Sequence, residues 1–146
     1  MQVELRVDNL LEFELLLARA SRGIERGLVP LVSNAARDLS SEIARTMKED
    51  PKTGKKYLFR GRLHIASAAG ESPAVRSGEL LRSITTTTLA RQGVFKAVGS
   101  PKIYARYLEK GTDRMSPRPA FEPSLAKVKT PFMQEVISLV KSGVYR

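Results

Sequence analysis

The stretch SITTTTLARQGVFKAVG, residues 83–99, decides the β part of this fold. Residues 85–91 are rich in β-branched side chains and alternate in polarity, and residues 94–99 alternate again. A Gln-Gly pair at residues 92–93 supplies a turn between them. The pattern predicts an antiparallel β-hairpin over residues 84–99.

A long apolar stripe before the hairpin predicts an N-terminal helical region that begins at Asp8. Its apolar residues recur every three or four positions, the spacing of one helix face. Asp8 or Asn9 is suited to cap this helix, and Pro51 lies just past its end. We expect the stripe to face the core. Its members are Leu17, Ala20, Ile24, Leu28, Leu31, Ala35, Leu39, Ile43 and Met47.

The N-terminal region carries two further signals. Pro30 lies inside the helical pattern, where it removes a backbone donor and clashes with the preceding turn. With Gly23 and Gly27 just before it, Pro30 predicts a kink or a break near residues 27–30. The alternation of residues 3–7 predicts a short edge strand.

The chain after the hairpin predicts a connector, a stiff linker and a last helix. Residues 101–110 form either a short helix or a strand-like connector that Gly111 ends. Residues 116–123 contain three prolines and must be extended. An apolar pattern from Phe121 to Val140 then predicts the helix, which Gly143 can end. Thr130-Pro131 can restart this helix as cap and first helical residue.

Together these elements predict one α+β domain over residues 1–146. It would consist of a long N-terminal helical region, a small antiparallel sheet around the central hairpin, and a C-terminal helix packed on the sheet. Residues 77–84 would form a turn that leads into the first strand.

Composition gives little support to catalysis or metal binding. The chain has no Cys, so it has neither a disulfide framework nor a thiolate metal site. Its one histidine, His64, lies between Leu63 and Ile65 and is expected to be structural. The acidic residues are too scattered to suggest a carboxylate pair. We expect no enzyme activity, no cofactor and no metal.

No apolar run approaches the roughly 20 residues of a membrane span, so no membrane partner is expected.

The positive charge is concentrated in the middle of the chain. Residues 1–50 hold 7 Lys and Arg against 9 Asp and Glu, whereas residues 51–118 hold 14 against 4. Within the middle, residues 51–76 predict an extended basic loop, because glycines and prolines break any periodicity. Cations and aromatics mix at Lys55, Lys56, Tyr57, Phe59, Arg60 and Arg62. This mixture suits either phosphate contact with base stacking or anchoring on a neighbouring subunit.

Four short motifs follow one another across the second half of the chain. They are Ala-Ser-x-x-Gly-x-x-Pro at residues 66–73, Ser-Gly-x-Leu-x-x-Ser-Ile at 77–84, Tyr-Ala-x-x-Leu-Glu-x-Gly-Thr at 104–112, and Arg118-Pro119. In this order the set resembles the neck proteins of long-tailed double-stranded DNA bacteriophages. That family is variously called tail-completion, tail-to-head joining or minor tail protein.

The resemblance implies a virion structural protein of a phage or prophage, made in the bacterial host cytoplasm and placed at the head-tail junction. Such a protein works as a homo-oligomer, a hexameric ring, through contacts with other phage neck and tail proteins. Genomic double-stranded DNA passes through or ends near such a ring, so a non-specific contact with DNA fits as well. We expect Tyr104, Tyr107, Glu109, Gly111 and Arg118 at or beside a subunit or partner interface. The alternatives are a tail terminator ring and a non-specific DNA-binding accessory protein.

Overall fold

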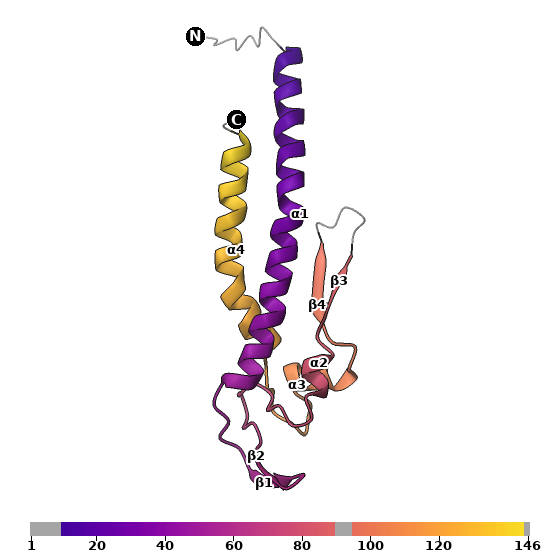
Figure 1. Cartoon of the computed structure of the whole chain (residues 1–146), viewed down its shortest axis with the longest axis vertical. Coiled ribbons are helices and arrows are strands. Elements are labelled where there is room, and N and C mark those ends of the chain that lie inside the picture. Colours follow the sequence, from indigo (N-terminus) through magenta and orange to yellow (C-terminus); the bar gives the residue numbers. More distant parts are fainter. Residues whose placement is uncertain (1–9, 90–94, 145–146) are drawn as a thin grey trace.

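The computed structural model describes residues 10–89 and 95–144 of the chain. Two helices, α1 (Leu10–Glu49) and α4 (Phe121–Val144), run antiparallel beside each other (Figure 1). At 1.5 Å per residue α1 is about 60 Å long, so the molecule is an elongated rod. The β3–β4 hairpin lies beside α1, and the short helices lie beside its lower end (Figure 1). The predicted α+β fold class is confirmed.

The central hairpin forms where it was predicted. Strand β3 (Thr85–Thr88) pairs antiparallel with β4 (Lys96–Gly99), and Thr85 lies opposite Gly99. The hairpin packs along α1, and β4 borders the same hollow as α4. The expected turn at residues 92–93 lies outside the described residues, as do the expected caps Asp8 and Asn9 and the expected strand at residues 3–7.

A second, separate hairpin corrects the prediction of a loop without structure at residues 51–76. Strand β1 (Lys56–Phe59) pairs with β2 (Arg62–Ile65), and the pair protrudes from the lower end of the molecule (Figure 1). Arg60 and Gly61 have φ values of 50° and 74°. Two successive residues with positive φ form the tight turn that matches strand twist. The prediction of a loop relied on the glycines and prolines, which break any helical periodicity here. The two short β-forming runs between them indicate the strands.

Of the kink or break predicted near residues 27–30, the break is absent, because α1 runs as one helix through Pro30. Packing against α4 accounts for this continuity. A Cβ at Gly27 would lie 2.5 Å from a methyl group of Leu139, so α4 sits directly on this turn. Likewise, Thr130-Pro131 does not restart α4, which also runs unbroken. Tertiary packing here outweighs the local preference of proline.

Two short helices complete the lower end. Helix α2 (Glu79–Arg82) occupies the segment predicted as a turn, and Gly78 precedes it with a φ of 74°. Helix α3 (Ile103–Lys110) settles the alternative between helix and connector, and Gly111 ends it as predicted.

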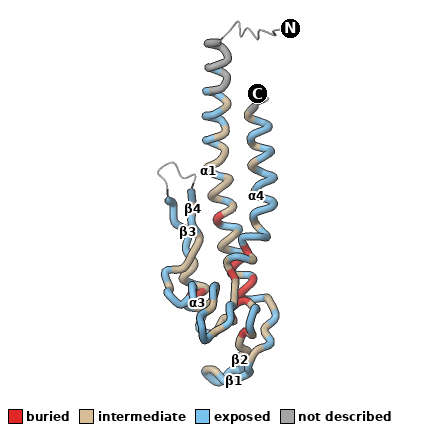
Figure 2. Tube along the Cα trace, turned by 180° about the vertical axis from the view of Figure 1, so that it is seen from behind, coloured by how far each residue is buried: buried red, intermediate tan, exposed pale blue. Residues whose placement is uncertain are grey.

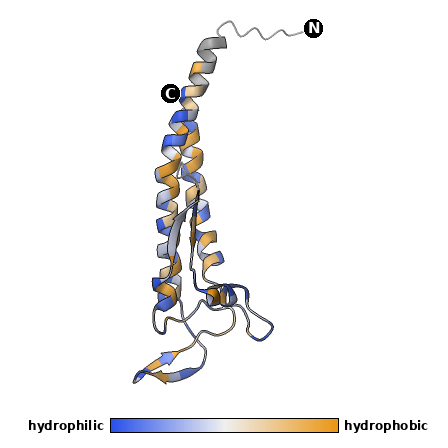
Figure 3. Ribbon diagram, turned by 90° about the vertical axis from the view of Figure 1, so that its right-hand side faces the viewer, coloured by the Kyte–Doolittle hydropathy of each residue, from blue (hydrophilic) through white to orange (hydrophobic). Residues whose placement is uncertain are grey.

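The core is small and lies at the base of the helix pair (Figure 2). Its buried members come from α1, α2, α3 and the residue just before α4: Ile43, Met47, Leu80, Ala105 and Ala120. Above this cluster α1 and α4 contact mainly each other and the hairpin (Figure 3). Most of the rod therefore has one buried face and wide exposed faces.

Candidate functional site

The four motifs recognised in the sequence lie together at the base of the helix pair. Arg118 Nε donates a hydrogen bond of 3.1 Å to the Ser67 carbonyl, and the Gly70 N–H donates to the Pro117 carbonyl at 2.8 Å. The Arg118 N–H donates to the Leu108 carbonyl at 2.6 Å. These bonds connect the first, third and fourth motifs, and Leu80 of the second motif is buried in the shared core.

Glu109 caps the N-terminus of α4. Its Oε2 accepts hydrogen bonds from the backbone N–H groups of Ala120 (2.8 Å) and Phe121 (3.1 Å), and its Oε1 accepts from Glu122 (2.7 Å). The first N–H groups of a helix have no partner within the helix, and a carboxylate there also suits the helix dipole. Glu109 thus fixes α4 to α3.

Gly111 is required by the backbone where α3 ends. Its φ is 75° and its ψ is −177°, a conformation that side chains strongly disfavour. A Cβ there would lie 2.8 Å from the Met115 carbonyl oxygen and 3.0 Å from Pro117. Glycine therefore allows residues 111–117 to fold back tightly.

The structure thus brings the five residues predicted for an interface into one region. Three of them contact their own chain, and two are exposed. Glu109, Gly111 and Arg118 make contacts within their own chain. Tyr104 and Tyr107 are 39% and 48% exposed on α3, beside the largely exposed Ile103. The tyrosines remain available to a neighbour, and an interface role stays a prediction.

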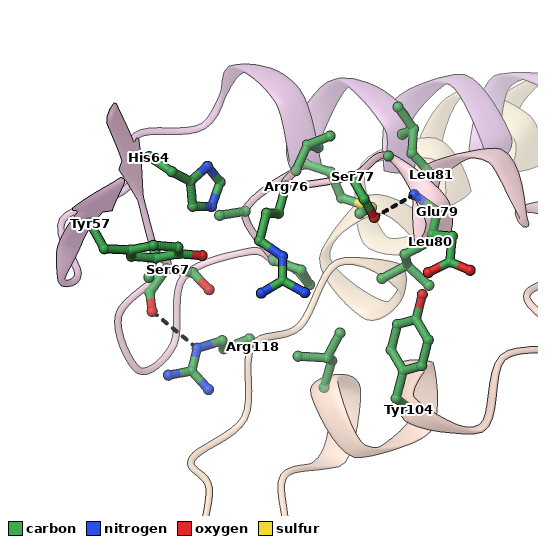
Figure 4. Close-up of a pocket in the computed structure, with 17 residues that line it drawn as sticks. Tyr57, His64, Ser67, Arg76, Ser77, Glu79, Leu80, Leu81, Tyr104 and Arg118 are labelled. Atoms are coloured by element: carbon green, nitrogen blue, oxygen red, sulfur yellow. Dashed lines mark hydrogen bonds between the residues drawn. The ribbon is translucent and has the colours of Figure 1, made fainter. Parts of the chain in front are cut away.

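A cleft of about 450 Å³ opens between the β1–β2 hairpin, residues 73–81 and α3 (Figure 4). Its walls mix apolar side chains with two guanidinium groups, Arg76 and Arg118. Tyr57 and His64 stand edge to face at one end, with ring centroids 5.1 Å apart. Glu79 also lines the cleft, but its carboxylate pairs with Lys102 at 3.1 Å. The cleft is therefore positively charged.

The β1–β2 hairpin, with Lys55 just before it, carries the six residues predicted for DNA or partner contact. Lys55, Lys56, Arg60 and Arg62 are exposed, whereas Tyr57 and Phe59 are half-buried on the cleft side. Arg60 and Arg76 lie 5.5 and 5.0 Å from the Phe59 ring centroid. The opposite face presents Leu58 and Leu63, 75% and 66% exposed. Tyr57 and Phe59 therefore contact residues of their own chain. The exposure of Leu58 and Leu63 was not predicted from the sequence.

Two polar contacts secure the segment that carries this hairpin. Glu71 accepts hydrogen bonds from the Thr53 hydroxyl, the Thr53 N–H and the Ala68 N–H. These bonds lower the pKa of Glu71, the Thr53 hydroxyl most strongly. Lys52 Nζ donates to Ser72, whose hydroxyl donates to the Thr46 carbonyl at 2.9 Å near the end of α1. Partial burial lowers the pKa of Lys52.

An apolar groove lies higher on the rod. Its floor is formed by Val32, Ala35, Ala36 and Leu39 of α1, and its walls by β4 and α4. Its volume is about 420 Å³. On α4 the apolar surface continues past the groove through Met133, Ile137 and Val140, each at least 40% exposed. The sequence did not predict this exposed apolar surface, because periodicity does not show how much of a helix face its neighbours cover.

Within residues 10–89 and 95–144, no three His, Asp or Glu side chains gather as a metal site would require. Over the same residues, no helix is long and apolar enough to cross a membrane. Comparisons with protein-family models, curated proteins and solved structures find no match to this chain.

Proposed function

We propose that this chain is a non-catalytic ring subunit of the head-tail junction of a long-tailed phage or prophage, acting in tail completion or head-tail joining. The four-motif resemblance suggests the family. The exposed surface of the chain is the observation that supports an assembly role.

The chain exposes more surface than a compact monomer of its size. Its accessible area over all 146 residues is 11231 Å². A compact monomer of 16.2 kDa is expected to expose roughly 7,500 Å². Part of the difference comes from the 16 residues outside the described ranges, and the rest comes from the exposed faces of the rod. A stable protein contact covers about 800 Å² on each partner, and faces of this kind fit a ring subunit, which needs at least two contacts.

Apolar side chains are exposed at three places on this surface. The α4 stripe at Met133 and Ile137, the groove beside it, and the Leu58–Leu63 pair lie at different heights along the rod. Large exposed apolar patches mark interaction sites. Their separation fits a subunit that contacts neighbours at more than one place.

Contact with DNA is the second candidate function, and fewer observations support it. The four exposed cations of the β1–β2 hairpin suit phosphate contact. Base stacking is disfavoured, because Tyr57 packs on His64 and Phe59 lies beneath Arg76. A sequence-independent contact with duplex passing through a ring is compatible with both proposals.

The ring proposal is tested by introducing a charge into the exposed α4 stripe. Ile137→Glu should leave the monomer folded, because Ile137 is 49% exposed, and should prevent self-association. Gln134→Glu places the same charge on an exposed position of the same helix and is the matched control. Each variant is scored by complementation in the phage that carries the gene, with electron microscopy counting free heads, free tails and joined particles.

Ile137→Glu should leave heads and tails unjoined, and Gln134→Glu should give normal particles. If particles assemble normally when the gene is deleted, the head-tail role is wrong. If deletion blocks joining but Ile137→Glu does not, the α4 stripe is not a subunit contact.

A further inference from the structure

The basic cleft of Figure 4 would suit an acidic occupant. Arg118 is held by the Ser67 carbonyl and Arg76 by the Phe59 ring, so both guanidinium groups border the same opening. Across the part of the chain that the structure describes, neither forms a salt bridge. Glu79 also lines the cleft, but its carboxylate pairs with Lys102. Two cations that border one cleft without a carboxylate of their own favour an anionic ligand.

The shape of the cleft favours a peptide over a nucleic acid. The two arginines share the walls with Met47, Leu80 and Leu108. Duplex phosphates are contacted by cations that protrude from a surface, whereas a concave site with apolar walls accommodates side chains. An occupant should therefore carry both carboxylates and apolar side chains.

One segment of this chain has that composition. Residues 1–17, MQVELRVDNLLEFELLL, contain four acidic residues and one Arg, and most of the others are apolar. The rest of the chain is strongly basic, since the net charge of the whole is +10. The charge of this segment thus complements that of the cleft.

The segment cannot reach the cleft of its own chain. Leu10 begins α1 at one end of the rod, and Met47 borders the cleft near the other end (Figure 1). At 1.5 Å per residue these positions are about 55 Å apart along a continuous helix. A second copy must supply the segment.

We propose that residues 1–17 of one copy dock in the Arg76–Arg118 cleft of the next. This contact joins unlike surfaces, and contacts of that kind close into rings when the rotation between subunits allows it. The inference rests on the proposed ring and adds the partner segment and the direction of subunit contact.

The absence of Cys makes crosslinking a direct test. Single variants Glu4→Cys, Asp8→Cys and Glu12→Cys are each mixed with a differently sized Ser77→Cys chain, assembled, and treated with a flexible bis-maleimide. Ser77 is exposed and lines the cleft, and this change keeps both arginines. At least one mixture should give a product of the summed mass. Arg106→Cys, on the exposed face of α3, replaces Ser77→Cys in the control and should give none.

Charge exchange supplies a second readout. Arg76→Glu should weaken self-association by about tenfold or more, and adding Glu12→Arg and Glu14→Arg to the same chain should restore it. Arg106→Glu is the matched reversal and should have little effect. Unfolding curves confirm that each variant folds.

If the wild type forms rings but none of the three cysteine mixtures gives a crosslinked product, the docking is overturned while the ring proposal stands. If the charge exchange does not restore association, the cleft binds another protein and the docking proposal is wrong. The docking proposal is also wrong if Arg76→Glu loses duplex binding while its self-association is unchanged. If the wild type forms no ring even in the virion, the proposed function fails first.

Discussion

Glu109 on α3 accepts a hydrogen bond of 2.8 Å from the backbone N–H of Ala120, at the start of α4. This contact spans residues 110–119 and fixes the direction in which α4 leaves the core. The Pro-rich segment was predicted to be extended over residues 116–123, but its last three residues already belong to α4. Ala120 itself is buried, so the capped turn is part of the core rather than a frayed end.

Glu109→Ala should therefore lower the free energy of unfolding by about 1–3 kcal/mol, because three backbone N–H groups lose a charged acceptor. Chemical denaturation measures the change. The control is Glu122→Ala, which removes an exposed partner of Lys110 and should change the free energy of unfolding little, because solvent screens the pair. Equal losses for the two variants would contradict the capping role.

Gly111→Ala should destabilise the chain by about 1–3 kcal/mol, since its backbone conformation is open mainly to glycine and the new Cβ meets the Met115 carbonyl. Gly23→Ala is the matched control. Gly23 lies in α1, where a new Cβ would point into open space, and the change should stabilise by up to about 1 kcal/mol. Thermal unfolding of both variants should shift in opposite directions.

The Glu42–Lys127 pair, at 3.0 Å, links α1 to α4 and should be sensitive to acid. Hydrogen bonds from Arg45 and then Lys127 lower the pKa of Glu42 from 4.5 to about 2. Because the folded-state pKa is the lower one, the stabilisation is present above pH 4.5 and is lost as the pH falls toward 2.

A double-mutant cycle with Glu42→Gln and Lys127→Met measures this. The coupling free energy should be at most about 1 kcal/mol at neutral pH, because Lys127 is half exposed. It should approach zero below pH 2. A coupling that is constant across this range would show that the contact does not depend on the Glu42 charge.

Changing Lys55, Lys56, Arg60 and Arg62 together to Ser separates a protein joint from a DNA contact. For a protein joint, we expect loss of head-tail joining while duplex binding by the wild type stays weak. If DNA binding is the function, log K should fall with log salt by about 0.9 per phosphate neutralised, and the four changes should flatten that slope by about three to four. Tight duplex binding together with normal joining by the mutant would favour the DNA-binding proposal.

The sequence by itself determined the elements whose signals are local. The apolar stripe from Leu17 to Met47 predicted α1, and the alternation on either side of residues 92–93 predicted β3 and β4. Gly111 was correctly placed at the end of α3. These predictions succeeded because periodicity and glycine conformation depend on neighbours a few residues away.

Only the tertiary structure decided what these elements contact. Arg118 and Ser67 are 51 positions apart, and no local pattern pairs them. The continuity of α1 through Pro30 depends on α4 packing at Gly27, which again is a long-range contact. The sequence also did not show that the apolar faces of α4 are wider than α1 can cover. Periodicity reveals which face of a helix is apolar, but the extent of its burial depends on the size and position of the elements that pack against it.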